Sequence, residues 1–471
     1  MRGGASYAGS GRLSDGGIGR QGVGARPAGR RLPFTRARDS HFGCRSRSPP
    51  TFRAGSGPDR KYRSSSSGII DLTENRDRHG GLALVGFAIS SSGGPLALAS
   101  IYLIPSTTPP RLEGVIALAG LLLFLAPLSI WLGFTREIAS SGGLYSFVRE
   151  ATGRKIAVLH GILWSVSYLL YLPFTVADIV YLLLPEILAI SPSAARLLEI
   201  GIPVVITATI ASGKRGPVYL LAGLALAQLV VLALFVMPLI GGTPSALGTS
   251  PIRVSVRPLP VLEAVGGTSL LFVCSSLVLY LGGEAKGDAT AIRKALVRGL
   301  AIVVALAVPS AFAIGRWLTP QIIASAVPGY ALALQSTGRI AAVVVGIASL
   351  ASLAGLVIAE YLALIRLWGA MLRFHWRRST AMIGAFFIAA DAVSLIDPAR
   401  FYAIAIVPSL AALYASQLIV FLVYPRFRRK HGGMRLGSWL AVVVAVAWAL
   451  YGLYIALAPS PPSGGSAASA Y

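Results

Sequence analysis

Long apolar segments separated by short polar ones run through the chain from residue 81 to residue 458. An α-helix rises about 1.5 Å per residue, so roughly 20 residues are needed to cross a hydrocarbon layer about 30 Å thick. Most of the apolar segments have about this length, which soluble cores rarely require. The pattern therefore predicts an all-α polytopic membrane protein.

Eleven membrane-spanning helices are expected. Their approximate limits are 81–104, 113–134, 155–183, 198–212, 217–240, 260–282, 295–318, 338–366, 381–396, 401–424 and 436–458. The fourth and ninth are short. The third and eighth exceed what a bilayer requires, so we expect them to tilt or to protrude.

Composition agrees with a membrane protein and argues against metal chemistry. Of the 471 residues, 55% are hydrophobic and 13% are charged, against about 25% charged in a typical soluble domain. The two cysteines, Cys44 and Cys274, build neither a disulfide framework nor a metal cluster. The five histidines show no ligand spacing. We therefore expect no metal site and no cofactor other than a coupling ion.

The formal net charge of +24 is distributed so that it orients the helices. With a cytoplasmic N-terminus, nineteen Lys and Arg residues fall in the segments expected inside and seven in those expected outside. Cytoplasmic loops of membrane proteins carry such an excess. We therefore expect a multi-pass protein of the plasma membrane with its C-terminus outside. The charge is topological and calls for no nucleic-acid partner.

Residues 1–80 differ from the rest of the chain. They are rich in Gly, Ser, Arg and Pro, a composition that cannot bury enough apolar surface to offset chain entropy. We interpret them as a disordered basic cytoplasmic tail. Three explanations remain open: a tether to anionic lipid or nucleic acid, an inert tail, or a wrongly assigned start codon.

A cluster of weak helix formers interrupts the first span at Ser90-Ser91-Ser92-Gly93-Gly94-Pro95. Proline lacks an amide hydrogen, and glycine lowers the cost of unwinding. Unwound backbone at membrane depth is tolerated where it lines a cavity or is buried in protein. A softer counterpart in the sixth span reads Cys274-Ser275-Ser276. Interrupted helices at corresponding positions of two halves indicate a transporter site, although small residues also serve helix packing.

Three segments resemble one known family. The stretch Arg136 to Gly153, with its Glu137-Ile138 and Gly142-Gly143-Leu144-Tyr145, is similar to a signature of the amino acid–polyamine–organocation (APC) superfamily. The segment Gly283 to Ala295 and the segment Ala363 to Arg373 resemble later motifs of that superfamily. The resemblance covers residues 81 to about 430.

The resemblance implies an inverted repeat of five plus five helices, the APC fold. The repeats would be 81–240 and 260–424, with an additional helix and a short uncharged tail in 425–471. A small-molecule substrate would bind between the first and sixth helices, with the third and eighth lining the path. The implied binding residues are Ser90, Ser91, Ser92, Gly93, Gly94, Phe272, Cys274, Ser275 and Ser276.

The chain departs from the family pattern in three places. The sixth-helix motif has Cys274, Ser275 and Ser276 where the family has Gly and Glu. The usual Asn-Pro after Glu284 is missing, and so is the twelfth span that many members have. These departures leave the implied fold in place and the substrate open.

Ionisable residues inside the spans are candidates for ion or substrate coupling, because they are costly there. Asp178 lies in the third span, either in a coupling role or simply hydrated near the outer interface. Glu360 is under two helical turns from Arg366, so we expect these two to pair. Asp391 lies on a peripheral helix and is interpreted as structural.

Ser349 and Ser352 share one face of the eighth span. In sodium-coupled proteins with the implied fold, hydroxyls here join first-helix carbonyls at a cation site; the alternative is a packing face of hydroxyls. Proton-coupled relatives use a fifth-helix lysine, where this chain has only Gln228. Na⁺ coupling or ion-free exchange is therefore favoured over H⁺ coupling.

The predicted function is a secondary active transporter, a permease that moves amino acids or related small organic solutes by alternating access. Because no cationic side chain faces the expected pocket, neutral or hydrophobic amino acids are favoured. The alternatives are a solute sensor that binds without transport and a permease for polyamines or nucleobases. An enzyme is not expected, because no span or loop holds an acid–base or metal constellation. The sequence leaves the oligomeric state open.

Overall fold

A computed structural model describes residues 79–104, 112–242, 258–286 and 288–458. The first half holds α1 (Gly81–Ser91), α2 (Pro95–Ala97), η2 (Leu98–Tyr102), α3 (Glu113–Phe134), α4 (Gly143–Thr152), α5 (Arg154–Ala177), η3 (Asp178–Leu183), α6 (Leu184–Ile187), α7 (Pro192–Ala211) and α8 (Gly216–Gly241). The predictions for the N-terminal tail and for the uncharged C-terminal end fall almost entirely outside the described residues.

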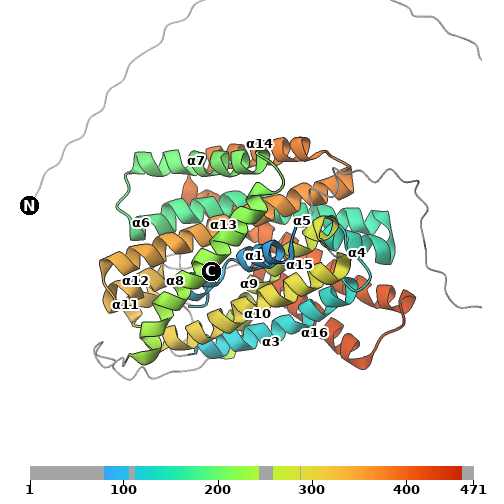
Figure 1. The fold of residues 1–471 in the computed structure, drawn as a ribbon, viewed down its shortest axis with the longest axis horizontal. Coiled ribbons are helices and arrows are strands. Elements are labelled where there is room, and N and C mark those ends of the chain that lie inside the picture. The colour runs from blue at the N-terminus through green and yellow to red at the C-terminus, as the bar shows by residue number, and fades with distance from the viewer. Residues whose placement is uncertain (1–78, 105–111, 243–257, 287, 459–471) are drawn as a thin grey trace, which may run out of the picture. The chain divides into compact units, whose positions relative to one another are not determined.

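The second half continues with α9 (Pro258–Leu271), η5 (Phe272–Glu284), α10 (Asp288–Gly315), α11 (Pro320–Ile323), α12 (Pro328–Ser336), α13 (Arg339–Leu372), α14 (Trp376–Ser394), α15 (Pro398–Lys430) and α16 (Leu436–Leu457). The described residues form no β-strand, only an isolated bridge between His79 and Ala285. The all-α prediction is confirmed (Figure 1).

Each of the eleven expected spans coincides with a helix, but only ten helices in the described residues are long and apolar enough to cross a membrane. The exception is α14, the ninth expected span. Its 19 residues include Arg377, Arg378 and Asp391, which leave no uninterrupted apolar stretch of membrane length. The third and eighth spans, Arg154–Ile187 and Arg339–Leu372, each have 34 residues, as their apolar runs predicted.

Helix contacts pair the two halves in a reciprocal way. The third helix of the first half, α5, packs against α15, and the third helix of the second half, α13, packs against α8. In the same manner α1 packs against α10, while α3 packs against α9. The fourth helices of the two halves, α7 and α14, pack against each other. Two repeats with the same helix order produce this exchange of partners.

A close approach explains the Gly142-Gly143 motif before α4. Gly143 has a φ of +49°, and a Cβ there would collide with the ring of Tyr280 in η5. Leu144, Phe147 and Val148 bury the apolar face of α4 in the main core. Glycine is required because only a residue without a side chain lets α4 begin against η5.

Irregular helix occurs at three points along the spans. After the break in the first span, η2 is a π-helix, and η3 is a second π-helix that begins at Asp178. The inner half of the sixth span, η5, is a 3₁₀-helix of 13 residues. Runs of 3₁₀-helix are usually three or four residues long, and both irregular forms concentrate at functional segments. The sequence indicated the first break but not the two π-helices.

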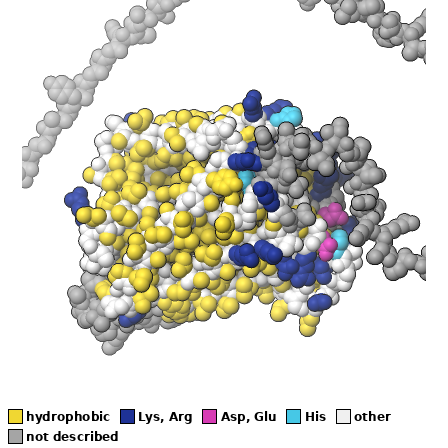
Figure 2. All heavy atoms as spheres, in the orientation of Figure 1, with side chains coloured by type: hydrophobic (Ala, Val, Ile, Leu, Met, Phe, Trp, Pro, Cys, Tyr) yellow, Lys and Arg dark blue, Asp and Glu magenta, His cyan; other side chains and the backbone are white. Residues whose placement is uncertain are grey.

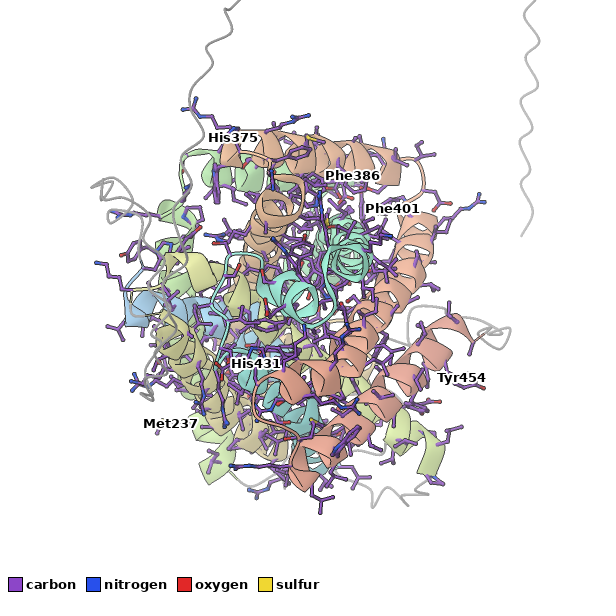
Figure 3. The ribbon with its side chains drawn as sticks, turned by 90° about the vertical axis from the view of Figure 1, so that its right-hand side faces the viewer. Met237, His375, Phe386, Phe401, His431 and Tyr454 are labelled. Atoms are coloured by element: carbon purple, nitrogen blue, oxygen red, sulfur yellow. The ribbon has the colours of Figure 1, made fainter. Side chains whose placement is uncertain are left out.

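Charge gathers at one end of the helices. Figure 2 shows Lys and Arg side chains concentrated at the right-hand end, while apolar side chains cover most of the remaining visible face. Figure 3 looks onto that end, where His375 and His431 lie before α14 and after α15. The ends of the helices therefore differ in charge, as the loop charges in the sequence predicted.

Candidate functional site

The first span breaks at Gly93 and Gly94. These residues have φ values of +79° and +71°, which side chains disfavour, and Pro95 then starts α2. A Cβ on Gly94 would collide with the Ser352 hydroxyl and the Gln228 amide. Next to Gly93 there is space, because a Cβ on that residue would lie 3.8 Å from its nearest neighbour, an atom of Leu98. Gly94 is thus required by both conformation and contact, and Gly93 by conformation alone.

An oxygen atom of the break itself meets one oxygen atom from each of two helices. The Ser352 hydroxyl of α13 lies 3.0 Å from the carbonyl oxygen of Gly93 and 2.7 Å from Oε1 of Gln228 in α8. One hydroxyl hydrogen can be donated to only one of them at a time. The Gln228 Nε2 atom is buried without a hydrogen-bond partner among the described residues. Side chains from both halves of the chain therefore contact the break.

A second pair of hydroxyls lies one turn away. Ser349 is 2.8 Å from Ser100 of η2, and its own hydroxyl also lies 2.8 Å from the carbonyl of Val345. The two serines predicted from the sequence thus both reach the first span: Ser352 at its break and Ser349 after it.

The serines before the break serve the backbone. The Ser90 hydroxyl donates to the carbonyl of Leu221 in α8, at 2.8 Å. Ser91 and Ser92 donate to carbonyls three residues earlier, at Ala88 and Ile89. Such bonds satisfy carbonyls that an unwinding helix frees.

The sixth-span candidates divide into two groups. Ser275 and Ser276 are fully buried, and their hydroxyls have no hydrogen-bond partner among the described residues. Cys274 is half-buried, with its thiol beside the Tyr168 hydroxyl of α5. The ring of Phe272 instead packs on Phe124 of α3, with ring centroids 5.7 Å apart. The helices α1 and η5 are in contact, as expected for the two broken spans.

Aromatic residues of α5 pack against η5. The ring of Trp164 lies 4.1 Å from that of Tyr168 and 4.6 Å from that of Tyr280 in η5. All three rings are buried. The indole nitrogen of Trp164, like the Ser275 and Ser276 hydroxyls, has no hydrogen-bond partner among the described residues. The Tyr168 hydroxyl lies beside the Cys274 thiol, and the Tyr280 hydroxyl lies near the backbone of Leu144. Buried polar groups are normally paired, so a cluster of unpaired ones indicates a place where water or a ligand completes the bonding.

Glu360 of α13 belongs to this cluster. It is fully buried, both of its carboxyl oxygens lack a hydrogen-bond partner among the described residues, and it lies within electrostatic range of Tyr168 and Cys274. The expected pair with Arg366 is wrong, because Arg366 binds Glu284 instead. Reasoning from one helix could not find this partner, which comes from η5.

Asp178 lies at the first residue of η3 and is 7% exposed, so it is a buried group rather than a hydrated interfacial one. It is within electrostatic range of Tyr102 in η2 and of Tyr171 in α5. The coupling role suggested for it stays a prediction.

Asp391 lies between helices, as its peripheral position suggested, but it has a neighbour that the sequence did not reveal. Glu199 of α7 and Asp391 of α14 are both fully buried, and the Ser394 hydroxyl donates to Glu199. The bond from Ser394 to Glu199 joins α14 to α7, whereas both carboxyl oxygens of Asp391 lack a hydrogen-bond partner among the described residues.

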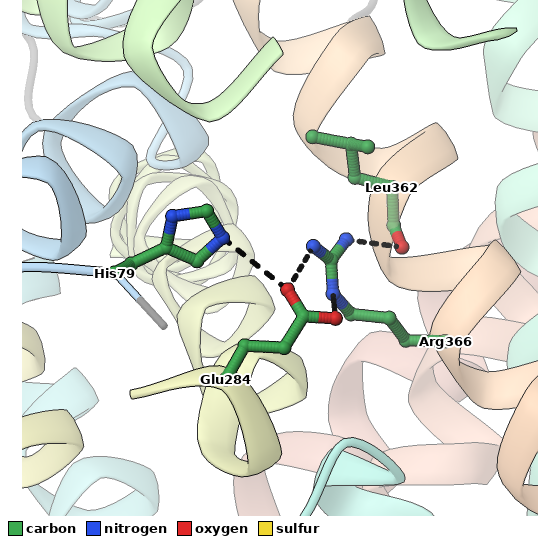
Figure 4. A network of polar contacts seen from close by, with 4 residues as sticks. All are labelled: His79, Glu284, Leu362 and Arg366. Carbon is green, nitrogen blue, oxygen red and sulfur yellow. Dashed lines mark hydrogen bonds and ion pairs between the residues drawn. The ribbon is translucent and has the colours of Figure 1, made fainter. Parts of the chain in front are cut away.

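A polar network connects the segment before α1 with η5 and α13 (Figure 4). The guanidinium of Arg366 binds both carboxyl oxygens of Glu284, at 3.1 and 2.6 Å, and also donates to the carbonyl of Leu362 at 3.0 Å. His79 Nε2 lies 3.3 Å from Glu284 Oε2. Backbone bonds from His79 to Glu284 and from Lys286 to His79 add to it. The network ties the start of α1 to η5 and α13.

The described residues hold no group of three or more His, Cys, Asp and Glu side chains arranged to bind a metal ion.

Comparison with solved structures defines the class of fold. A manganese transporter of Eremococcus coleocola, in a mutant form, matches with a TM-score of 0.56 at 15% identity, over 83% of this chain and 89% of its own. A Na⁺-coupled sialic acid symporter in a substrate-bound, outward-open state matches with a TM-score of 0.53 at 12% identity, over 83% of this chain and 92% of its own.

Both proteins are transporters, and the likeness at these identities concerns the fold. No protein-family model matches the chain, and comparison with curated proteins yields no significant match. The chain is therefore a multi-pass membrane protein with the fold of secondary transporters.

Proposed function

We propose that this protein is a secondary active transporter of the APC superfamily that moves amino acids or related small organic solutes by alternating access. The observation that carries the proposal is a set of unpaired buried polar atoms on η5, α8 and α13, all of which contact α1. It includes the hydroxyls of Ser275 and Ser276, the amide of Gln228 and the carboxyl of Glu360. A solute with an amine, a carboxyl and a small side chain can complete such bonds.

The arrangement at the break supports binding of a carboxylate. Freed amides at the start of a half-helix attract anions. Here α2 starts directly after Gly94, with Pro95 as its first residue. The unpaired Ser275 and Ser276 hydroxyls supply donors from η5, which contacts α1.

Na⁺ is proposed as the coupling ion. Oxygen atoms are the ligands preferred by hard cations. The hydroxyl oxygen of Ser352 lies between two other oxygen atoms. It is 3.0 Å from the carbonyl oxygen of Gly93 and 2.7 Å from Oε1 of Gln228. Ser352→Ala removes this central oxygen and should reduce the dependence of uptake on Na⁺.

A second substrate class is favoured by one observation. Glu360 brings an unpaired acid to the cluster, although the sequence had indicated a pair with Arg366. A buried carboxylate is costly unless a cation meets it. Polyamines or cationic amino acids would supply that cation, so they belong in the test beside neutral amino acids.

The test is uptake by the purified full chain in proteoliposomes. Labelled neutral amino acids, cationic amino acids, polyamines and nucleobases are each offered under an inward Na⁺ gradient, an inward H⁺ gradient and exchange conditions. We expect saturable accumulation of one class, lost in Gly94→Leu. Binding without accumulation under all conditions would make the protein a sensor, and transport by Gly94→Leu at the wild-type rate would refute the site.

A further inference from the structure

A groove outside the candidate site runs between the start of α1 and the first turns of α10. It consists of two adjoining cavities of about 240 and 570 Å³, which share Gly81, Val85 and Arg298. The smaller cavity is lined by the basic side chains of Lys286, Lys294 and Arg298.

The larger cavity is apolar. It is lined by Leu82 and Val85 of α1 and by Ala301 and Ile302 of α10, with Arg298 at the junction. Leu82 is 89% exposed, the kind of side chain that a membrane protein turns to lipid. Beside the groove, α1 and α10 are in close contact, because a Cβ on Gly299 would collide with Ala88.

The charge of the smaller cavity selects an anion. Among the residues whose side chains the structure describes, no Asp or Glu lines it. The start of α1 adds to this, because the N-cap residue Gly80 offers no side-chain cap and the first turn holds no acidic residue. The amides of such a helix start favour negative charge.

We propose that this groove binds an anionic phospholipid. The phosphate lies among Lys286, Lys294 and Arg298, and one acyl chain follows Leu82, Val85 and Ile302. Basic pockets between transmembrane helices are suited to acidic lipid headgroups. A free phosphate would contact the same cations, but it has no apolar group to fill the larger cavity.

The groove lies next to the polar network of His79 and Glu284, so a bound lipid acts on that network. The amide of Lys286 donates to the carbonyl of His79 at 3.1 Å, and His79 contacts Glu284. A phosphate that holds Lys286 and α10 near the start of α1 favours the arrangement in which this network is intact. Bound lipid therefore stabilises the intact network.

Binding is measured on the purified full chain in neutral detergent, by native mass spectrometry and by the midpoint of thermal unfolding. Phosphatidylglycerol, phosphatidylcholine and glycerol phosphate are the probes. The variant combines Lys286→Gln, Lys294→Gln and Arg298→Gln. We expect it to lose about 100-fold in affinity for phosphatidylglycerol, since each basic residue near an anionic lipid surface contributes roughly fivefold.

Matched controls lie on the same helix. Arg293→Gln removes an exposed α10 charge that does not line the groove, and it should leave the affinity unchanged. Ile302→Trp should block the apolar part, while Val297→Trp, at a 42% exposed residue outside it, should not.

Three results would overturn the proposal. They are equal affinity of the wild type and the triple variant for phosphatidylglycerol, equal binding of phosphatidylcholine, and displacement of the lipid by an equal concentration of glycerol phosphate. The last would define a small-anion site. None of these readouts depends on transport, so the lipid site can fail while the proposed function stands.

Discussion

Gly93 and Gly94 are neighbours with different requirements. Both have positive φ, but only Gly94 is pressed against side chains of α8 and α13. A residue with a side chain at positive φ costs about 1–2 kcal/mol. At Gly94 an added Cβ would also displace Ser352 and Gln228, which adds to that cost and moves the oxygen atoms that contact the break.

Gly94→Ala is therefore expected to reduce solute uptake by at least tenfold, since a factor of ten corresponds to about 1.4 kcal/mol. Gly93→Ala should have the smaller effect. Gly223→Ala in α8 is the control, because a Cβ there meets nothing within 4 Å, so uptake should match the wild type. Uptake in proteoliposomes decides, and equal uptake by Gly94→Ala and Gly223→Ala would contradict the contact argument.

Glu360 is a buried acid without a hydrogen-bond partner in the described part of the chain, so its charge is costly to the fold. Glu360→Gln keeps the shape and removes the charge. We expect the midpoint of thermal unfolding to stay or to rise, while uptake falls about tenfold or more. If the midpoint falls together with uptake, the carboxyl supports the structure and has no part in transport.

At the scale of elements, we propose that the network around Glu284 closes one end of the substrate path. It depends on one carboxylate shared by two helices and the segment before α1. Glu284 is 16% exposed and the Arg366 side chain 3%, so the pair is mostly shielded from water. Removing one partner of a fully buried pair costs about 3–5 kcal/mol. Partial exposure of Glu284 reduces this, and we take about 1–3 kcal/mol as the expected loss of closure.

Arg366→Gln should therefore open this end, and Cys274 can report it. Because the only other cysteine is Cys44, a Cys44→Ser background leaves a single thiol near the candidate site. We expect a membrane-impermeant thiol reagent, applied from the side of His79, to label Cys274 at least tenfold faster in Arg366→Gln.

The matched control for that experiment is Arg377→Gln, which removes an exposed basic residue from the start of α14. Its labelling rate should equal that of the parent. Unchanged labelling in Arg366→Gln would mean that the network does not limit access to the site.

For the whole molecule, the arrangement of charge predicts orientation. The Lys and Arg side chains gather at one end of the helices, the end that carries His375 and His431 (Figures 2 and 3). Membrane insertion places such an excess in the cytoplasm. An epitope tag after residue 458 should then be accessible from outside intact cells, and a tag inserted after Gly432 only after permeabilisation. The reverse accessibility would show that the orientation in the membrane is opposite to the one proposed here.

The candidate site shows where prediction from the sequence stopped. The break at Ser90–Pro95 was visible because Gly and Pro act locally on the backbone. Of the partners of that break, Ser352 was expected from the family resemblance. Gln228 was not, because it lies far away along the chain and reaches the break only through packing. Arg366 was assigned to Glu360, its neighbour on one helix, whereas a closer partner comes from η5.

By itself, the sequence determined the positions and the approximate limits of the long helices, their partition by charge and the place where the first one unwinds. These properties follow from local terms: apolar length, backbone propensity and loop charge. Only the tertiary structure decided which polar groups remain unpaired, that α14 lies against α7, and that Glu284 pairs with Arg366. Those properties depend on distances between segments far apart in sequence, which no local pattern encodes.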